Sequence, residues 1–216
     1  MIRFAPAGGL RRLLVLGAHS DDGEIGCGGT VLRLIEENKE LAVRWIVFGG
    51  VDPVRAREAT ESARSFLKGS KNPEIAVHGF RDSFFPYTGA EIKETFEKLK
   101  KDFQPDLVLT HYHDDAHQDH RVVSSLTWNT FRDHCILEYE VPKYDGDLWR
   151  PNLYVPLSEE TCRKKVRHVM ESFPSQAKRA AWFTEDTFWA PLRLRGVESN
   201  SPTKFAEGFW ARKIVL

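Results

Sequence analysis

Apolar residues along the first 140 positions alternate between two spacings. Short, nearly continuous apolar runs predict buried strands at residues 12–18, 41–48, 74–80, 106–112 and 135–141. Between them, apolar residues at helical spacing predict helices at residues 28–39, 52–69, 90–103 and 119–134. Strands and helices that alternate in this way form β-α-β units. We therefore predict an α/β fold, a Rossmann-like and mostly parallel sheet with helices on both faces.

The last third of the chain has a weaker pattern. Six prolines interrupt it, and only residues 158–173 show a clear helical spacing. We find no internal repeat and no linker long enough to separate domains. The sequence is therefore interpreted as one domain over residues 1–216, with a β-α-β core at 1–140 and substrate-side loops and closing elements at 141–216.

Composition narrows the range of functions. Lysine plus arginine equals aspartate plus glutamate at 31 each, so no global field favours nucleic acid or an anionic membrane. No apolar run approaches the ~20 residues that a membrane span needs, and residues 1–12 lack the apolar middle of a secretory signal. Cys27, Cys135 and Cys162 lie far apart without a C-x-x-C pair. We expect a reduced, cytoplasmic protein; a homo-oligomer is compatible with this composition.

Two clusters of ionisable residues follow predicted strands. The first is "AHSDDGE", residues 18–24, after the first strand, and the second is "THYHDDAHQDH", residues 110–120, after the fourth. The second cluster holds four of the chain's eight histidines. Because ligands of open parallel sheets bind outside the carboxyl ends of the strands, both clusters should face one crevice.

A nucleotide-binding loop is one interpretation of the first cluster, because glycines follow its strand. The glycines do not fit G-x-G-x-x-G, however, and Asp21, Asp22 and Glu24 would place negative charge where a phosphate must lie. The glycines instead favour a tight turn and close packing where the first helix begins.

A hydrolytic metal site is the interpretation that both clusters favour. Aspartates near a helix start are common, but they do not explain four histidines within ten residues. Catalytic zinc typically takes three protein ligands from His, Asp and Glu. His19, Asp22 and one histidine of the second cluster would form such a set. Asp21, next to a ligand, is placed to accept a proton from water there.

These residues also resemble a known family. "AHSDDGEIGCGGT" resembles the A-H-P-D-D-x-E…G-G-T motif of the LmbE/PIG-L family of zinc-dependent N-acetylglucosaminyl deacetylases, and "AHQDH" resembles its H-P-D-H motif. "RARE", residues 55–58, resembles its R-x-x-E, and "SQ" at 175–176 is a weaker echo. The resemblance covers about the first 140 residues. Ser20 and Gln118 stand where the family usually has proline, which changes loop stiffness but removes no catalytic group.

The resemblance implies a role for each matching residue. His19, Asp22 and His120 would bind one zinc ion or another divalent metal. Asp21 would be the general base, and His117 would polarise the amide carbonyl or stabilise the oxyanion. Asp119 would hold an imidazole in its useful tautomer.

The resemblance also implies a reaction, hydrolysis of the N-acetyl group of an amino sugar or its conjugate. A catalytically silent carbohydrate or sugar-nucleotide binding module and another metallohydrolase, an esterase or phosphoesterase, are the alternatives. For the substrate we expect contacts from Arg55, Arg193 and Arg195, the last two suited to an anionic carrier. An ion pair with Glu58 is an equally good interpretation of Arg55.

Overall fold

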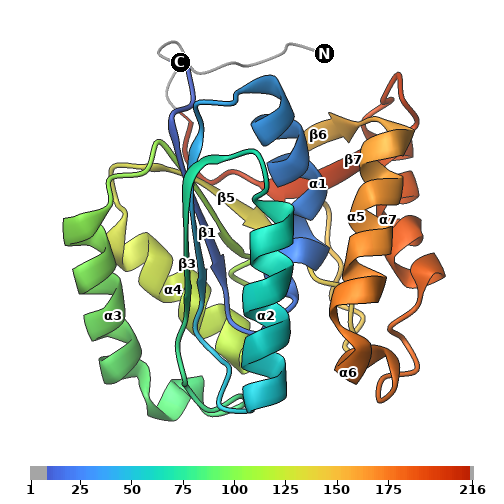
Figure 1. Cartoon of the computed structure of the whole chain (residues 1–216). Coiled ribbons are helices and arrows are strands. Elements are labelled where there is room, and N and C mark those ends of the chain that lie inside the picture. Colours follow the sequence, from blue (N-terminus) through green and yellow to red (C-terminus); the bar gives the residue numbers. More distant parts are fainter. Residues whose placement is uncertain (1–8, 215–216) are drawn as a thin grey trace.

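A seven-stranded sheet runs through the centre of the protein, and helices cover both of its faces (Figure 1). The computed structural model describes residues 9–214. The strands are β1 Arg12–Gly17, β2 Ala42–Val47, β3 Lys71–Val77, β4 Leu107–His111, β5 Cys135–Tyr139, β6 Leu153–Leu157 and β7 Phe205–Trp210. The helices are α1 Asp22–Glu37, α2 Pro53–Phe66, the 3-10 turn η1 Phe85–Tyr87, α3 Gly89–Asp102, α4 Gln118–Thr130, α5 Glu159–Ser172, α6 Pro174–Ala177 and α7 Glu185–Glu198.

The strand order is β3-β2-β1-β4-β5-β7-β6. The first five strands pair in parallel, and β7 runs antiparallel to both β5 and β6. The chain moves outward from β1 to β3 and then returns to place β4 on the other side of β1. The point where the strand order reverses therefore lies between the carboxyl ends of β1 and β4, where open α/β sheets bind ligands.

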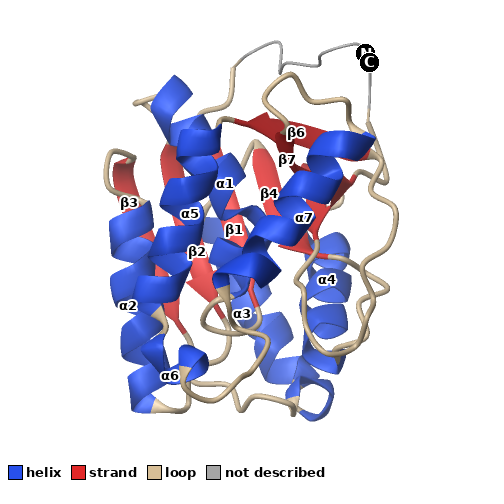
Figure 2. Cartoon of the chain, turned by 90° about the vertical axis from the view of Figure 1, so that its right-hand side faces the viewer, coloured by secondary structure: helices blue, strands red, loops and turns tan. Residues whose placement is uncertain are grey.

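The sheet separates two hydrophobic cores. On one face, apolar side chains of α1, α2, α5 and α7 pack together, and Figure 2 shows these four helices on the side turned toward the viewer. On the other face, α3, α4 and η1 contribute Ile92, Phe96, Val123 and Phe85 to the second core. This two-faced covering explains why β1 is an unbroken apolar run, since its side chains are buried on both faces.

The predicted fold class and the five predicted strands are confirmed, but the start of the first helix is not where the sequence pattern predicts it. We predict a helix from Gly28, whereas α1 begins at Asp22. The glycines after Asp22 are therefore helical residues rather than a turn. They permit close packing: a Cβ on Gly26 would lie 2.1 Å from Cδ2 of Tyr139, and one on Gly23 would lie 2.5 Å from the Trp45 ring.

The last third contains more regular structure than its pattern predicts. Helix α5 matches the predicted helix closely, and Ser158 caps it by accepting a hydrogen bond from Thr161 N–H. Strands β6 and β7 extend the sheet, and α7 continues past an internal proline, Pro191. Within residues 9–214, no helix is both long and apolar enough to span a membrane.

Candidate metal and catalytic site

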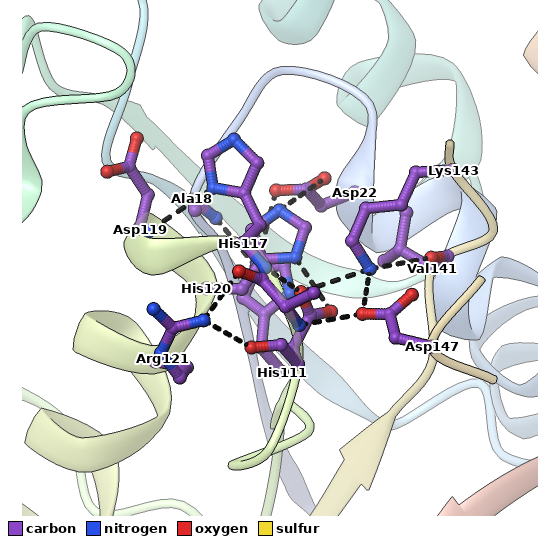
Figure 3. A network of polar contacts seen from close by, with 12 residues as sticks. Ala18, Asp22, His111, His117, Asp119, His120, Arg121, Val141, Lys143 and Asp147 are labelled. Atoms are coloured by element: carbon purple, nitrogen blue, oxygen red, sulfur yellow. Dashed lines mark hydrogen bonds and ion pairs between the residues drawn. The ribbon is translucent and has the colours of Figure 1, made fainter. Parts of the chain in front are cut away.

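The two ionisable clusters meet at the carboxyl ends of β1 and β4. His19 follows β1, and Asp22 is the first residue of α1. His117 is the N-cap of α4, and His120 lies in its first turn. The two motifs thus meet at the point where the strand order reverses, and Figure 3 shows the polar contacts between them.

His19, Asp22 and His120 bring possible ligand atoms together, and Asp22 faces the two imidazoles with different carboxylate oxygens. His19 Nδ1 lies 3.1 Å from His120 Nε2 and 3.4 Å from Asp22 Oδ2. His120 Nε2 also lies 3.4 Å from Asp22 Oδ1. A tetrahedral ion with bonds of about 2.0–2.1 Å has ligand atoms about 3.3 Å apart. The distances between the facing atoms, 3.1–3.4 Å, are close to this spacing.

The other nitrogen of each imidazole contacts a buried carboxylate. His19 Nε2 lies 3.0 Å from Asp119 Oδ2, and His120 Nδ1 lies 3.0 Å from Asp115 Oδ2. Asp119 also accepts the backbone N–H groups of Ser83 and Phe85. A carboxylate on one nitrogen fixes the proton there and leaves the lone pair of the other nitrogen for a metal. Asp119 thus holds His19, and Asp115 holds His120.

Asp115 is a residue that the sequence interpretation does not single out. Its neighbour Asp114 has the same side chain, but the Asp114 side chain is 63% exposed whereas that of Asp115 is 3% exposed. Nothing in the run of two aspartates shows which one turns inward. The only feature of the sequence that favours Asp115 is its position five residues before His120. A loop of that length can bring its side chain back to the first turn of α4.

The electrostatics of the cluster favour a cation. Burial lowers the pKa of His19, but Asp22 and the hydrogen bond to Asp119 outweigh burial and raise that pKa to about 10. Burial raises the pKa of Asp22, but His120, His111 and His19 outweigh it and hold that pKa well below its usual range. A field that keeps a proton on a buried imidazole also stabilises a bound metal cation.

Two further histidines border this cluster. His117 Nδ1 accepts the backbone N–H of Asp119 at 3.2 Å, so the neutral ring carries its proton on Nε2. Burial and the nearby His19 and His120 lower the pKa of His117 to about 4. His111 is fully buried, stacks on His120, and accepts the backbone N–H of Ala18 at Nε2.

Among the described residues 9–214, two groups of three side chains have ligand atoms within 4.8 Å of one another, namely His19–His117–His120 and Asp22–His111–His120. In the first group, His117 Nδ1 is used as the helix cap. In the second, His111 Nε2 is used by a backbone N–H. Of the facing atoms, His19 Nδ1, His120 Nε2 and Asp22 Oδ1 have no such backbone contact within the described residues, whereas Asp22 Oδ2 accepts the backbone N–H of His19 at 2.6 Å. The residues present therefore fit a metal ion held by these three.

Asp21, which precedes Asp22 in the chain, contacts helix α2. Its Oδ1 accepts a hydrogen bond from Arg55 Nη2 at 3.0 Å, and the Asp21 residue is 6% exposed. Arg55 Nη1 also lies 3.7 Å from Glu58, whose carboxylate accepts the N–H and hydroxyl of Ser175. Arg55 therefore contacts the candidate base and Glu58, as the ion-pair interpretation expects, while its Nη1 has no hydrogen-bond partner among the described residues.

Arg193 and Arg195, the two C-terminal arginines expected to bind substrate, contact neither Asp21 nor Glu58. Arg195 is 2% exposed, and its guanidinium donates to Glu140, Glu198 and the carbonyl of Trp149. These bonds occupy the donors that substrate binding would need, so the expected role of Arg195 is not supported by this geometry. Arg193 is exposed on α7 and donates to the carbonyl of Lys204. Both arginines hold the C-terminal elements together.

The fold and site together define a Rossmann-like α/β protein with a candidate metal centre at its switch point. The family model for PIG-L, described as GlcNAc-PI de-N-acetylase, matches residues 14–131, which is more than half of the chain. The protein belongs to this family.

Solved structures with the same fold carry more than one activity. The N,N'-diacetylchitobiose deacetylase of Pyrococcus horikoshii shares 22% identity, with a TM-score of 0.72 over 95% of this chain and 85% of that one. A zinc-inhibited form of teicoplanin deacetylase shares 14%, with a TM-score of 0.70 over 93% and 97%. GalB, the 4-carboxy-2-hydroxymuconate hydratase of Pseudomonas putida, shares 15%, with a TM-score of 0.71 over 96% and 98%. At these identities the similarity shows the fold.

Proposed function

We propose that this protein is a metal-dependent deacetylase that hydrolyses the N-acetyl group of an amino sugar or its conjugate. The observation that carries the proposal is the spacing of 3.1–3.4 Å among facing atoms of His19, Asp22 and His120. The family match supports the reaction, because the family description is that of a de-N-acetylase. The fold alone would not, since a hydratase shares it.

His19, Asp22 and His120 would hold the metal. Zinc or another divalent ion bound there would act as a Lewis acid toward the amide carbonyl and make a water molecule more acidic. Zinc-inhibited teicoplanin deacetylase is a reason to test several metals, since zinc is inhibitory for that protein.

Asp21 is the proposed general base. Arg55 contacts Oδ1, so Oδ2 is the oxygen that remains to take a proton from water attacking the acetamide carbon. Once protonated, the same group can return that proton to the departing amine. A buried carboxylate held by an arginine keeps a fixed orientation during this transfer, which is the requirement for general acid–base catalysis.

His117 is the proposed oxyanion stabiliser. Its Nδ1 accepts a backbone N–H, and its pKa is lowered to about 4, so the ring is neutral at pH 7 with a proton on Nε2. A neutral imidazole can donate that N–H to the carbonyl oxygen as negative charge develops there.

For the sugar itself, the candidate contacts are Tyr144 and Trp149 on the connection from β5 to β6. These residues are 75% and 56% exposed, and aromatic faces suit the apolar side of a sugar ring.

The test is mass-spectrometric detection of a lost acetyl group. We would incubate metal-loaded protein with N-acetylglucosamine, N,N'-diacetylchitobiose, a uridine-diphosphate conjugate and a phosphatidylinositol conjugate of N-acetylglucosamine. The His19→Ala and His120→Ala variants serve as controls. Acetate release from at least one substrate by the wild type alone supports the proposal. Binding of a sugar without acetate release would favour the silent binding module.

A further inference from the structure

The connection between β5 and β6, residues 140–152, contacts the candidate site although it lies outside the segment matched by the family model. Lys143 contacts the site through its ammonium group. Its Nζ lies 3.0 Å from Asp115 Oδ1 and 2.5 Å from Asp147 Oδ2, and it also donates to the carbonyl of Val141 (Figure 3). The Lys143 side chain is only 10% exposed. Its ammonium is therefore a largely buried cation shared by two carboxylates.

Each of these carboxylates holds the loop between β4 and α4. Asp147 Oδ2 accepts the backbone N–H of Ala116 at 2.7 Å, and Asp115 Oδ1 accepts that of His117 at 2.8 Å. Asp115 Oδ2 also contacts Nδ1 of His120. Two successive backbone N–H groups and one imidazole thus depend on two carboxylates that would repel each other without a cation between them.

We propose that Lys143 is a positioning residue for the candidate site, acting by holding Asp115 and Asp147 together against the β4–α4 loop. Its consequence for catalysis rests on the proposed function, because it acts through His117 and His120. Without the ammonium, two buried like charges face each other. Asp147 is the carboxylate free to swing away, because neighbouring Leu148 and Trp149 are exposed. Ala116 then loses its acceptor, and the loop that places His117 loosens.

Residue-resolved amide hydrogen exchange of metal-free protein tests this directly. In Lys143→Met we expect the Ala116 and His117 amides to exchange at least about tenfold faster, while Val15 and Leu109 in the central strands keep their rates. Lys143→Arg should retain protection, because a guanidinium can bridge two carboxylates. Lys143→Met combined with Asp147→Asn should regain part of the Ala116 protection, since one like charge is gone and the amide oxygen still accepts. Lys101→Met, at an exposed position on α3, is the matched control and should match the wild type.

Turnover supplies the second measurement. In Lys143→Met, loaded with metal, kcat should fall about tenfold with KM changed less than about twofold. The reason is that His117, which the loosened loop would displace, acts in the transition state. Unchanged exchange at Ala116 and His117, or equal acceleration in β1 and β4, would overturn the proposal. So would a local loss of protection with an unchanged kcat. If the wild type releases no acetate, the proposed function fails, while the exchange rates still decide whether Lys143 orders the loop.

Discussion

Adjacent aspartates at the start of α1 face different partners. Asp22 contacts His19, His111 and His120, whereas Asp21 contacts Arg55 on α2. The difference arises because Asp21 is the N-cap and Asp22 is the first helical residue, so their side chains leave the backbone in different directions. Two aspartates that are neighbours in the chain therefore have different proposed roles, Asp21 as a base and Asp22 as a metal ligand.

Replacing these aspartates one at a time separates the two roles. Asp21→Asn should keep one equivalent of metal and lose turnover by about a hundredfold or more, the scale of general acid–base catalysis. Asp22→Asn should instead weaken metal binding. Metal analysis together with initial rates makes the comparison. Loss of metal in both variants, or retention in both, would show that this division of roles is wrong.

Asp115 should act on the metal through His120. Asp115→Asn places an amide opposite Nδ1 of His120 and no longer fixes that proton, so metal affinity should fall about 10- to 100-fold. Asp114→Asn is the matched control, because its side chain is 63% exposed and should change affinity by less than about twofold. Competition with a chelator of known affinity measures both. Equal affinities for the two variants would contradict the contact's proposed role.

The sequence predicts the chemistry of single residues better than their partners. His19, Asp22 and one histidine of the second cluster could be placed together because motifs after parallel strands share one edge of the sheet, and the family resemblance selected His120 among the four histidines. Lys143 and Asp115 could not, since their contact joins two loops, and loop conformation depends on the whole packed structure. Arg195 shows the same limit: a basic residue in a proline-rich region suggests a substrate contact, but burial against Glu140 gives it a structural role.

At the scale of elements, α1 is held close to the sheet by its glycines. A Cβ on Gly26 would lie 2.1 Å from the Tyr139 ring, and that ring is fixed because its hydroxyl donates to the carbonyl of Leu16 at 2.6 Å. The helix begins with the candidate base and a candidate ligand. Its approach to β5 therefore also sets the position of the site.

Gly26→Ala should destabilise the protein by about 1–3 kcal/mol, because overpacking outweighs the better helix propensity of alanine. The melting temperature should fall by roughly 3–10 °C. Gly89→Ala is the control: it lies at the start of α3 with no atom within 4 Å of a new Cβ, so its melting temperature should be unchanged or slightly higher. Equal melting temperatures for both variants would show that α1 can shift at no cost.

Three helices also meet at a buried polar contact. Ser62 of α2 donates to Glu24 of α1 at 2.6 Å and lies 3.3 Å from Nε2 of His168 on α5. Burial raises the pKa of Glu24 to about 8, and burial lowers that of His168 to about 4. Both shifts favour the uncharged form at neutral pH, which suits the position of the two groups between packed helices.

This contact predicts a pH dependence. The folded state keeps a proton on Glu24 that the unfolded chain releases near its ordinary pKa of 4.5, so the wild type loses stability as the pH rises from there toward about 8. Glu24→Gln mimics the protonated acid and has no such loss. In metal-free protein, the melting temperature of Glu24→Gln relative to the wild type should therefore increase by at least ~3 °C between about pH 5 and about pH 8. A constant difference would show that Glu24 is ionised in the folded protein.

Element boundaries show where sequence periodicity stops being informative. Strands β1, β2, β4 and β5 were predictable because most of their side chains are buried, which makes them nearly continuous apolar runs. The sequence pattern places the start of β3 at residue 74 rather than at Lys71, because the first four residues of the strand are exposed and carry no apolar pattern. The start of α1 was not, since Gly23, Gly26, Gly28 and Gly29 have low helix propensity and only packing against Trp45, Tyr139, Phe66 and Leu157 explains them. Helix α7 carries Pro191 inside it, a residue that usually ends a helix.

On the scale of the whole molecule, the sheet topology and the family match agree on one location. The strand order reverses between β1 and β4, and the two motifs that define the family resemblance follow those strands. The C-terminal third completes the sheet with β6 and β7. Its residues Lys143 and Asp147 contact the β4–α4 loop. The part of the chain beyond the family match therefore supports the site as well as bordering it.

Metal titration of acetate release tests whether hydrolysis depends on one metal ion held by His19, Asp22 and His120. Protein freed of metal with a chelator would receive increasing zinc, or another divalent ion, while acetate release from an N-acetyl sugar that the wild type accepts is followed. We predict that activity rises in proportion to added metal and levels off at one equivalent per chain. His120→Ala should show no such rise, and Asp21→Asn should bind one equivalent without gaining activity. Full acetate release by metal-free protein would show that hydrolysis needs no metal ion. Equal metal activation of the His120→Ala variant would show that His120 does not hold it.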